Sequence, residues 1–275
     1  MNKKYTKRTF LLEIFAIMLA LLFLVPFYFV LINSVKGFSE ILIDAAALPK
    51  VVLFSNYAKV WEIISFQDAF LNSLVITVFS IAGIVVISSM AAWKMVRTPG
   101  RLSKILFLFF VSAMVIPFQT VMIPLMKLGG ALGIMNSLPG IIIMYFGFGV
   151  SLSLFLYHGF IKTIPQEIEE SAQIDGCSQF GVFWRIVFPL LKPITVTVII
   201  LNTLWIWNDY LLPLLVLQDS ELRTIPLATS SFFAQYTKQW DMGLAALVLG
   251  IAPIIVFFLF LQKHIIKGIA AGSIK

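Results

Sequence analysis

Six apolar segments, each long enough to cross a lipid bilayer, constrain this chain more than any other feature. A transmembrane helix needs about 20 mainly apolar residues, because the bilayer offers no water to satisfy backbone polar groups. The six segments are Leu11–Ile32, Phe70–Trp93, Ile105–Met126, Pro139–Ile161, Ile194–Leu217 and Met242–Leu261. Only 12% of the 275 residues are charged and 60% are hydrophobic, unlike a soluble domain. The sequence therefore predicts an all-α polytopic membrane protein with six transmembrane helices.

The distribution of Lys and Arg predicts how these helices are oriented. Cytoplasmic loops carry an excess of both residues. An even number of spans places both termini on one side, and the segments on that side hold 14 of the 20 Lys and Arg residues. We therefore expect both termini, and the segment between the fourth and fifth spans, to face the cytoplasm. No small-residue cleavage site follows the first span, so we interpret it as a retained helix and not as a signal peptide.

The chain lacks the sequence patterns of common enzymes. HExxH, GxSxG, a P-loop and GxGxxG with an acidic partner are all missing from the sequence. A single Cys177 excludes an internal disulfide, and two distant histidines, His158 and His264, predict no metal site. The basic residues that give the net charge of +7 form short clusters beside apolar segments, so nucleic acid is a poor candidate partner.

Ionisable residues inside the apolar segments are few. Glu13, Lys94, Lys192 and Asp209 all lie toward the segment ends. An ion-coupled transporter usually needs carboxylates or a proton relay within the membrane, where charge is costly and kept for function. If this chain transports a solute, we expect the energy to come from another subunit. A self-sufficient secondary transporter or channel is the alternative from a different class.

A charged segment between the fourth and fifth spans is predicted to form a helical hairpin. It covers Pro165–Pro193, with the sequence PQEIEESAQIDGCSQFGVFWRIVFPLLKP. The three acidic residues at its front fall in the first turns of a helix, where the helix dipole favours negative charge. That helix is expected to stop at Asp175-Gly176, because glycine readily adopts the left-handed conformation that closes a helix.

The two predicted helices of the hairpin differ in their apolar residues, which are aliphatic in the first helix and mainly aromatic in the second. Ile164, Ile168 and Ala172 recur at four-residue spacing and predict a weakly apolar stripe on the first helix. The second helix is expected to start at Ser178 and to carry an aromatic face of Phe180, Phe183, Trp184 and Val187. Such a hairpin could lie on lipid headgroups. Its acidic front is unfavourable beside an anionic leaflet, so we favour docking into the groove of a soluble protein.

The hairpin resembles the EAA motif of bacterial ABC importer permeases. The residues that carry this resemblance are Glu170, Ser171, Ala172, Asp175, Gly176, Ile186 and Pro189. Ser171 replaces the usual alanine, which keeps the residue small. Four further segments are similar to the MalG-like branch of carbohydrate-uptake permeases: Phe70–Leu74, Trp207–Tyr210, Arg223–Leu227 and Gly268–Lys275.

The resemblance implies a type I ABC importer permease fold in a bacterial cell membrane. Such a permease pairs with a second, MalF-like permease, and an extracellular solute-binding protein delivers the sugar, an oligosaccharide. Two ATP-binding subunits hold the ATP, so the chain itself would be non-catalytic and need no cofactor. The seven motif residues would couple the permease to the ATPase, and the tail Ala270–Lys275 is a second docking candidate. Within the same architecture, amino acids, peptides or phosphate are the alternative cargo.

The resemblance also implies a domain plan. Residues 1–69 would hold the N-terminal cytoplasmic segment, the first span and an extracytoplasmic loop. Residues 70–262 would form the permease core, with the coupling hairpin at 163–187, and residues 263–275 a cytoplasmic tail.

Several polar and aromatic residues in the third and fifth spans are candidates for contact with a sugar. Hydrogen bonds could come from Gln119, Asn202, Asn208 and Asp209, and Trp205 or Trp207 could stack on a sugar ring. We favour the alternative that these groups bond to neighbouring helices, as polar side chains in membranes often do. Pro117, just before Gln119, predicts a kink that could line a cavity.

Overall fold

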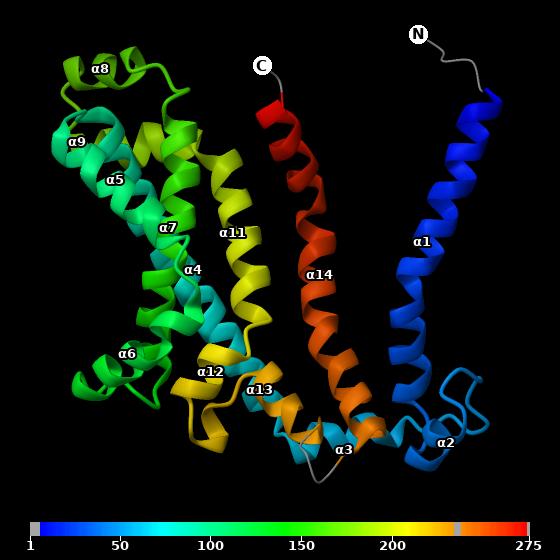
Figure 1. The fold of residues 1–275 in the computed structure, drawn as a ribbon. Coiled ribbons are helices and arrows are strands. Elements are labelled where there is room, and N and C mark those ends of the chain that lie inside the picture. Colours follow the sequence, from blue (N-terminus) through cyan, green and yellow to red (C-terminus); the bar gives the residue numbers. More distant parts are fainter. Residues whose placement is uncertain (1–5, 234–237, 274–275) are drawn as a thin grey trace. The chain divides into compact units, whose positions relative to one another are not determined.

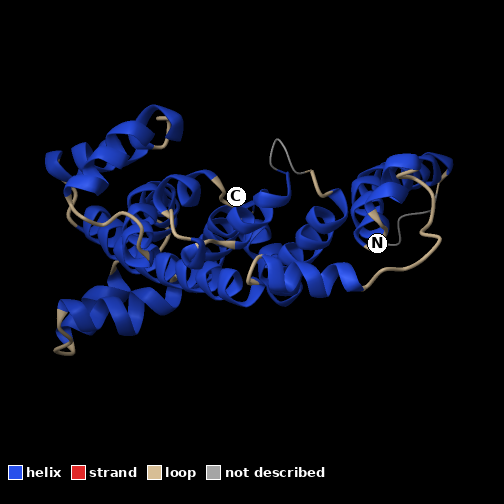
Figure 2. Cartoon of the chain, turned by 90° about the horizontal axis from the view of Figure 1, so that it is seen from below, coloured by secondary structure: helices blue, strands red, loops and turns tan. Residues whose placement is uncertain are grey.

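The computed structural model describes residues 6–233 and 238–273, with side chains described as far as Phe260. All regular structure in these residues is helical (Figure 2). The α-helices, labelled in Figure 1 where there is room, are α1 (Lys7–Ser34), α2 (Phe38–Ile43), α3 (Ser55–Ile63), α4 (Phe66–Arg97), α5 (Arg101–Ala113), α6 (Phe118–Ala131), α7 (Leu138–Ile161), α8 (Glu167–Ile174), α9 (Gln179–Val182), α10 (Phe188–Leu190), α11 (Lys192–Trp207), α12 (Leu211–Val216), α13 (Ile225–Thr229) and α14 (Trp240–Ser273).

Four helices are long and apolar enough to cross a membrane alone: α1, α4, α7 and residues Trp240–Phe260 of α14. Two more candidates are pairs of helices bent at a short break. These pairs are α5 with α6, and Gln179–Leu190 with α11. Counting each pair as one span gives up to six within the described residues. The prediction of an all-α polytopic membrane fold is confirmed.

The third predicted span, Ile105–Met126, is not one continuous helix. α5 stops at Ala113, α6 starts at Phe118, and the pair is bent by 105°. Pro117 immediately precedes α6. It has no N–H to extend the ladder of α5, and its ring disfavours helical geometry in the residue before it. The predicted kink is therefore a complete break.

The fifth predicted span, Ile194–Leu217, ends earlier as a helix than its apolar sequence suggested. α11 stops at Trp207 and α12 begins at Leu211. Between them, Asp209 Oδ1 accepts the backbone N–H of Leu211 at 3.0 Å. A carboxylate that satisfies a free N–H at a helix start stabilises the new helix. Hydropathy alone could not detect this boundary, because α12 is as apolar as α11.

The chain divides into two compact units, residues 1–66 with 229–253 and residues 67–228 with 254–275. In the first unit, buried polar side chains order the loop after α1. Lys36 is fully buried, and its Nζ donates to the carbonyl of Asp44 at 3.1 Å. Asn56 Nδ2 donates to the carbonyl of Lys36 at 2.9 Å. Two backbone N–H groups bond to the Asp44 carboxylate and lower its pKa, because these bonds favour the charged form.

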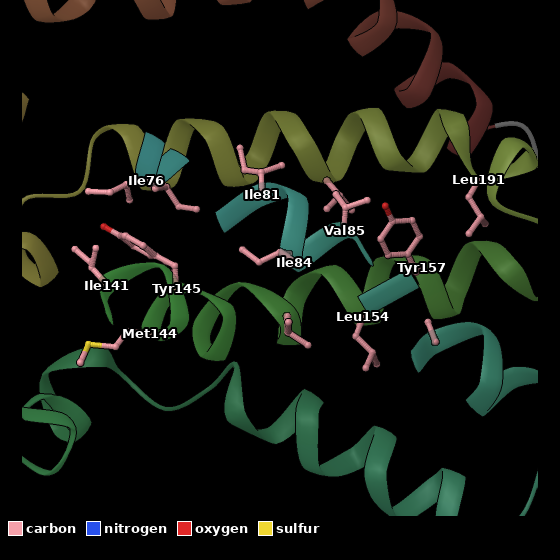
Figure 3. Packing of buried hydrophobic residues seen from close by; sticks show 14 of the residues in the cluster. Ile76, Ile81, Ile84, Val85, Ile141, Met144, Tyr145, Leu154, Tyr157 and Leu191 are labelled. Carbon is pink, nitrogen blue, oxygen red and sulfur yellow. The ribbon is translucent and has the colours of Figure 1, made fainter. Parts of the chain in front are cut away.

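The core of the second unit lies around α4 and α7 (Figure 3). Ile84 of α4 and Tyr145, Leu154 and Tyr157 of α7 are all fully buried. Tyr157 Oη donates to the Thr195 hydroxyl of α11 at 3.0 Å, which satisfies a polar group that would otherwise be buried alone. Apolar packing and a small number of internal hydrogen bonds therefore hold the three helices together.

Asn72 and Ser73, near the start of α4, hold the loop that follows α12. Asn72 Nδ2 donates to the carbonyl of Glu221 at 2.7 Å and to that of Arg223 at 3.2 Å. Ser73 Oγ accepts the N–H of Ile225 at 2.9 Å. Asn72, Ser73, Arg223 and Ile225 belong to two of the segments behind the family resemblance. The resemblance there corresponds to a contact that fixes a loop to a helix.

Asn136 ties the same loop to the turn between α6 and α7. Its backbone is left-handed, with φ of 52°, a conformation that asparagine tolerates better than most residues. Its Oδ1 accepts the N–H groups of Gln218 and Asp219 at 2.9 and 3.0 Å, and its Nδ2 donates to the Asp219 carboxylate at 2.7 Å. Two separate anchors therefore fix the loop.

Gly149 of α7 marks a close approach between helices. A Cβ atom there would lie 2.3 Å from Ile84 Cδ1 and 2.9 Å from Asn202 Oδ1, so a larger residue does not fit without repacking. Gly147, two residues earlier, has open space at the corresponding position.

We predict that Gly149→Ala destabilises the protein by about 1–3 kcal/mol, the usual cost of overpacking a core. Gly147→Ala is the matched control and should not destabilise, because its methyl group meets no neighbour and alanine favours helix. Thermal unfolding of the two purified variants in the same detergent measures the difference. Equal unfolding temperatures would contradict the close approach.

Candidate functional site: a helical hairpin and a polar cluster

α8 and α9 form the hairpin that the sequence predicts (Figure 1). The chain reverses at Gly176, whose φ of +83° lies in the left-handed region. Ser178 is the N-cap of α9, and its Oγ accepts the N–H of Gly181 at 3.2 Å. A π-helix, Phe183–Val187, follows α9 and leads into α10. The turn at Gly176 and the second helix after Ser178 are confirmed.

A buried ion pair fastens α8 to the end of α4. Arg97 Nη2 lies 2.7 Å from Glu169 Oε1, and Arg97 Nε donates to the same oxygen at 2.9 Å. The other carboxylate oxygen, Oε2, accepts the indole N–H of Trp93 at 2.8 Å. Arg97 also donates to the carbonyl of Ile164, in the turn that leads into α8. The side chains of Arg97 and Glu169 are only 13% and 4% exposed.

The predicted apolar stripe packs against the core only in part. Ile164 is buried and Ala172 packs against the core, but Ile168 is 44% exposed, whereas Glu169 is buried. The carboxylate of Glu169, and not the side chain of Ile168, is buried because three donors surround it. A fully hydrogen-bonded charge can be buried when its partner is also charged. Sequence reasoning missed Trp93, Arg97 and Glu169. The available signal was an acidic residue beside the motif and an arginine at the end of a span.

The aromatic side chains of the second helix lie together, as predicted. The ring centroid of Trp184 is 6.1 Å from that of Phe180 and 5.0 Å from that of Phe183. Their burial differs, since Phe183 and Val187 are fully buried and Phe180 is 65% exposed. The second helix is also not one continuous α-helix, because a π-helix, whose hydrogen bonds span five residues, follows Val182.

The seven motif residues share this hairpin but differ in exposure. The exposed members are Glu170, Ser171, Asp175, Gly176 and Pro189, and the half-buried members are Ala172 and Ile186. Gln166 Nε2 donates to Glu170 at 2.9 Å. Ile174, beside these residues, is 86% exposed. The hairpin therefore presents acidic, small and apolar side chains on one accessible element.

The second docking candidate, the tail Ala270–Lys275, lies outside the residues whose side chains the structure describes. The backbone of α14 continues to Ser273.

Asn202 and Asn208 of the fifth span bond within the chain. Asn202 Nδ2 donates to Ser153 Oγ of α7 at 3.1 Å and to the carbonyl of Val198 at 2.9 Å. Asn208 Nδ2 donates to the carbonyl of Leu204, in its own helix, at 2.7 Å. The bond of Asn202 to α7 is the helix-to-helix contact that we expected, whereas Asn208 bonds within its own helix.

Asp209 lies between α11 and α12 and bonds to two elements. Its Oδ2 accepts the hydroxyl of buried Tyr145 at 2.9 Å, and its Oδ1 caps Leu211. Each carboxylate oxygen therefore has a partner within the protein.

Trp205 lies beside this polar cluster and remains 42% exposed. Its ring packs edge-on against Tyr145, with ring centroids 5.5 Å apart. Trp205 and Asn202 line one hollow of about 300 Å³, together with Met114, Phe148, Gly149, Leu152 and Leu201. Gln119, exposed in the first turn of α6, is not among the residues that line it.

The fold, with its broken spans and its polar hairpin between two of them, is that of a multi-span membrane protein. The family described as "Binding-protein-dependent transport system inner membrane component" matches residues 83–271, and the chain belongs to that family. It is therefore a permease subunit of a binding-protein-dependent ABC importer, a multi-pass protein of the cell membrane.

Curated relatives resemble the chain over its whole length. It is 43% identical to the probable starch degradation products transport system permease protein AmyC of Thermoanaerobacterium thermosulfurigenes, over 99% of both chains. It is 34% identical to the melibiose/raffinose/stachyose import permease protein MelC of Bacillus subtilis, over 100% of both chains.

A solved structure has the same fold. It is a chain of a bacterial ABC transporter involved in the import of the acidic polysaccharide alginate. The TM-score is 0.80 at 21% identity, covering 95% of this chain and 99% of the other.

We predict that Asp209→Ala destabilises the protein by about 1–3 kcal/mol, because the Tyr145 hydroxyl is left buried without its acceptor. Asn208→Ala is the matched control. Its exposed side chain bonds only to its own helix, and the change should cost about 0.5 kcal/mol or less. Thermal unfolding of both variants tests this, and an Asp209→Ala protein as stable as the control would contradict it.

Proposed function

We propose that this chain is one of two permease subunits in an ATP-driven importer of oligosaccharides. The observation that carries the proposal is the identity of 43% with AmyC over 99% of both chains. Relatives at this level of identity share a class of cargo more often than proteins that share only a fold. MelC, named for three oligosaccharides, supports the same class of cargo.

The hairpin is the element through which we propose that the ATP-binding subunits act. Its exposed apolar side chains, among them Ile168, Ile174 and Phe180, are costly in water and stabilising in a protein groove. Glu170 and Asp175 place negative charge beside them. A groove with apolar walls and basic residues at its rim would complement this surface.

The division of labour follows from this assignment. ATP binds to two partner subunits, so this chain is non-catalytic and holds no cofactor of its own. A second, MalF-like permease supplies the other half of the pathway, and an extracellular binding protein delivers the sugar. The count of Lys and Arg supports an orientation with the hairpin and both termini in the cytoplasm.

Trp205 is the residue that we propose for contact with the sugar in the transport pathway. Asn202, Asn208 and Asp209 each have a hydrogen bond within the chain, so a structural role accounts for their presence. An exposed indole ring beside a hollow can stack on the apolar face of a sugar.

Reconstitution in liposomes tests the proposal. The complex of this chain with its second permease, ATP-binding subunits and binding protein should take up labelled malto-oligosaccharides or raffinose only when ATP is present. Liposomes with this chain alone should take up neither sugar. Uptake by the chain alone along an ion gradient would refute the proposal and support a secondary transporter, and uptake of amino acids or phosphate in place of sugars would refute the cargo.

Substitution of Gly176 tests the hairpin separately. Gly176→Val should reduce uptake at least tenfold, because a β-branched residue is strained at φ of +83° although the position has open space. Gly176→Asn is the matched control and should keep most of the uptake, since asparagine tolerates left-handed geometry. Membrane insertion of both variants should equal that of the wild type. Normal ATP-driven uptake by the valine variant would rule out a coupling role for this turn.

A further inference from the structure

We infer that Arg97 and Glu169 act as positioning residues that lock the hairpin to α4, so that α8 and the end of α4 move as one body during transport. The inference rests on the proposed function. It states that the end of α4 moves together with the hairpin when the ATP-binding subunits displace the hairpin.

The geometry joins one carboxylate to two residues on successive turns of a single helix. Glu169 Oε1 accepts from Arg97 Nε at 2.9 Å, and Oε2 accepts from Trp93 Nε1 at 2.8 Å. Trp93 and Arg97 are four residues apart, so both point from the same face of α4. A carboxylate held at both oxygens can neither rotate nor slide along α4 without breaking a bond. The contact therefore fixes both the orientation of α8 relative to α4 and the distance between the two helices.

Burial makes this contact difficult to open during a conformational change. Glu169 is 3% exposed, and its carboxylate can be reached mainly from a hollow of about 230 Å³ that Arg97 and Glu169 both line. Removing one member of a buried pair leaves an uncompensated charge, which is far more costly than opening an exposed pair. The movement that opens and closes the pathway must therefore occur at other, weaker contacts.

The pair also holds the segment that joins the hairpin to α7. Arg97 Nη2 donates to the carbonyl of Ile164 at 3.0 Å, three residues before α8 begins. The guanidinium thus holds both α8 and the turn that leads into it. The opposite side of α8 stays accessible at Glu170, Ser171 and Ile174. One side of the hairpin is therefore available to a partner while the other is bonded to α4.

Uptake and ATP hydrolysis, each measured per assembled complex, separate a coupling role from a purely structural one. Glu169→Gln keeps the shape but loses the charge, and should lower uptake at least tenfold while ATP hydrolysis continues. Arg101→Gln, which removes an exposed charge at the start of α5, is the matched control and should behave as the wild type. The double variant that exchanges the two residues, Arg97→Glu with Glu169→Arg, should have higher uptake than Arg97→Glu alone or Glu169→Arg alone. Wild-type uptake by Glu169→Gln, or no recovery in the exchange, would overturn the inference.

Distance measurement tests the movement itself in a complex whose ion pair is intact. Spin labels at Thr98, the residue after α4, and at Glu167 of α8, both exposed, report the separation of α4 and α8 after Cys177 is replaced by alanine. The separation should be the same without nucleotide and with ATP bound, and should change or broaden in Glu169→Gln. A wild-type separation that differs between the two states would overturn the inference while leaving the proposed function standing. A wild-type complex without ATP-driven uptake would overturn both.

Discussion

The position of the hairpin in this permease depends on the carboxylate of Glu169. This carboxylate lies at a junction where a transmembrane helix, a turn and a surface hairpin meet, and its bonds to Trp93 and Arg97 hold the three together. Apolar packing alone would let α8 slide, because most of its surface faces away from the core. A buried charge, in contrast, has one favourable position, where all of its donors are in place.

The same requirement shapes the polar residues of the spans. Inside a bilayer, polar groups that find no water gain most by bonding to one another, and Asp209 pairs with Tyr145 and Asn202 with Ser153. These bonds position α11 and α12 against α7. Trp205, beside this cluster, is 42% exposed and is the residue that we propose for contact with the sugar.

The sequence was sufficient for the features that depend on composition and on local backbone chemistry. Long apolar segments predicted a helical membrane protein, and Asp175-Gly176 predicted the turn of the hairpin. It was insufficient where partners come from distant parts of the chain. Glu169 could be predicted as buried only if Arg97, 72 positions earlier, were known to lie beside it. The end of α11 likewise depends on a carboxylate cap that hydropathy cannot detect, and the period of the second hairpin helix depends on a π-helix.

α4 is fastened near both of its ends, to the loop after α12 through Asn72 and Ser73 and to the hairpin through Trp93 and Arg97. Its 32 residues form one helix about 48 Å long at 1.5 Å per residue, more than the thickness of the hydrocarbon core. An unbroken helix resists compression along its axis, since every turn is braced by hydrogen bonds to the next. α4 thus joins the hairpin to the loop after α12 as one rigid element, and in the mechanism that we propose a displacement of the hairpin along the axis of α4 displaces that loop as well.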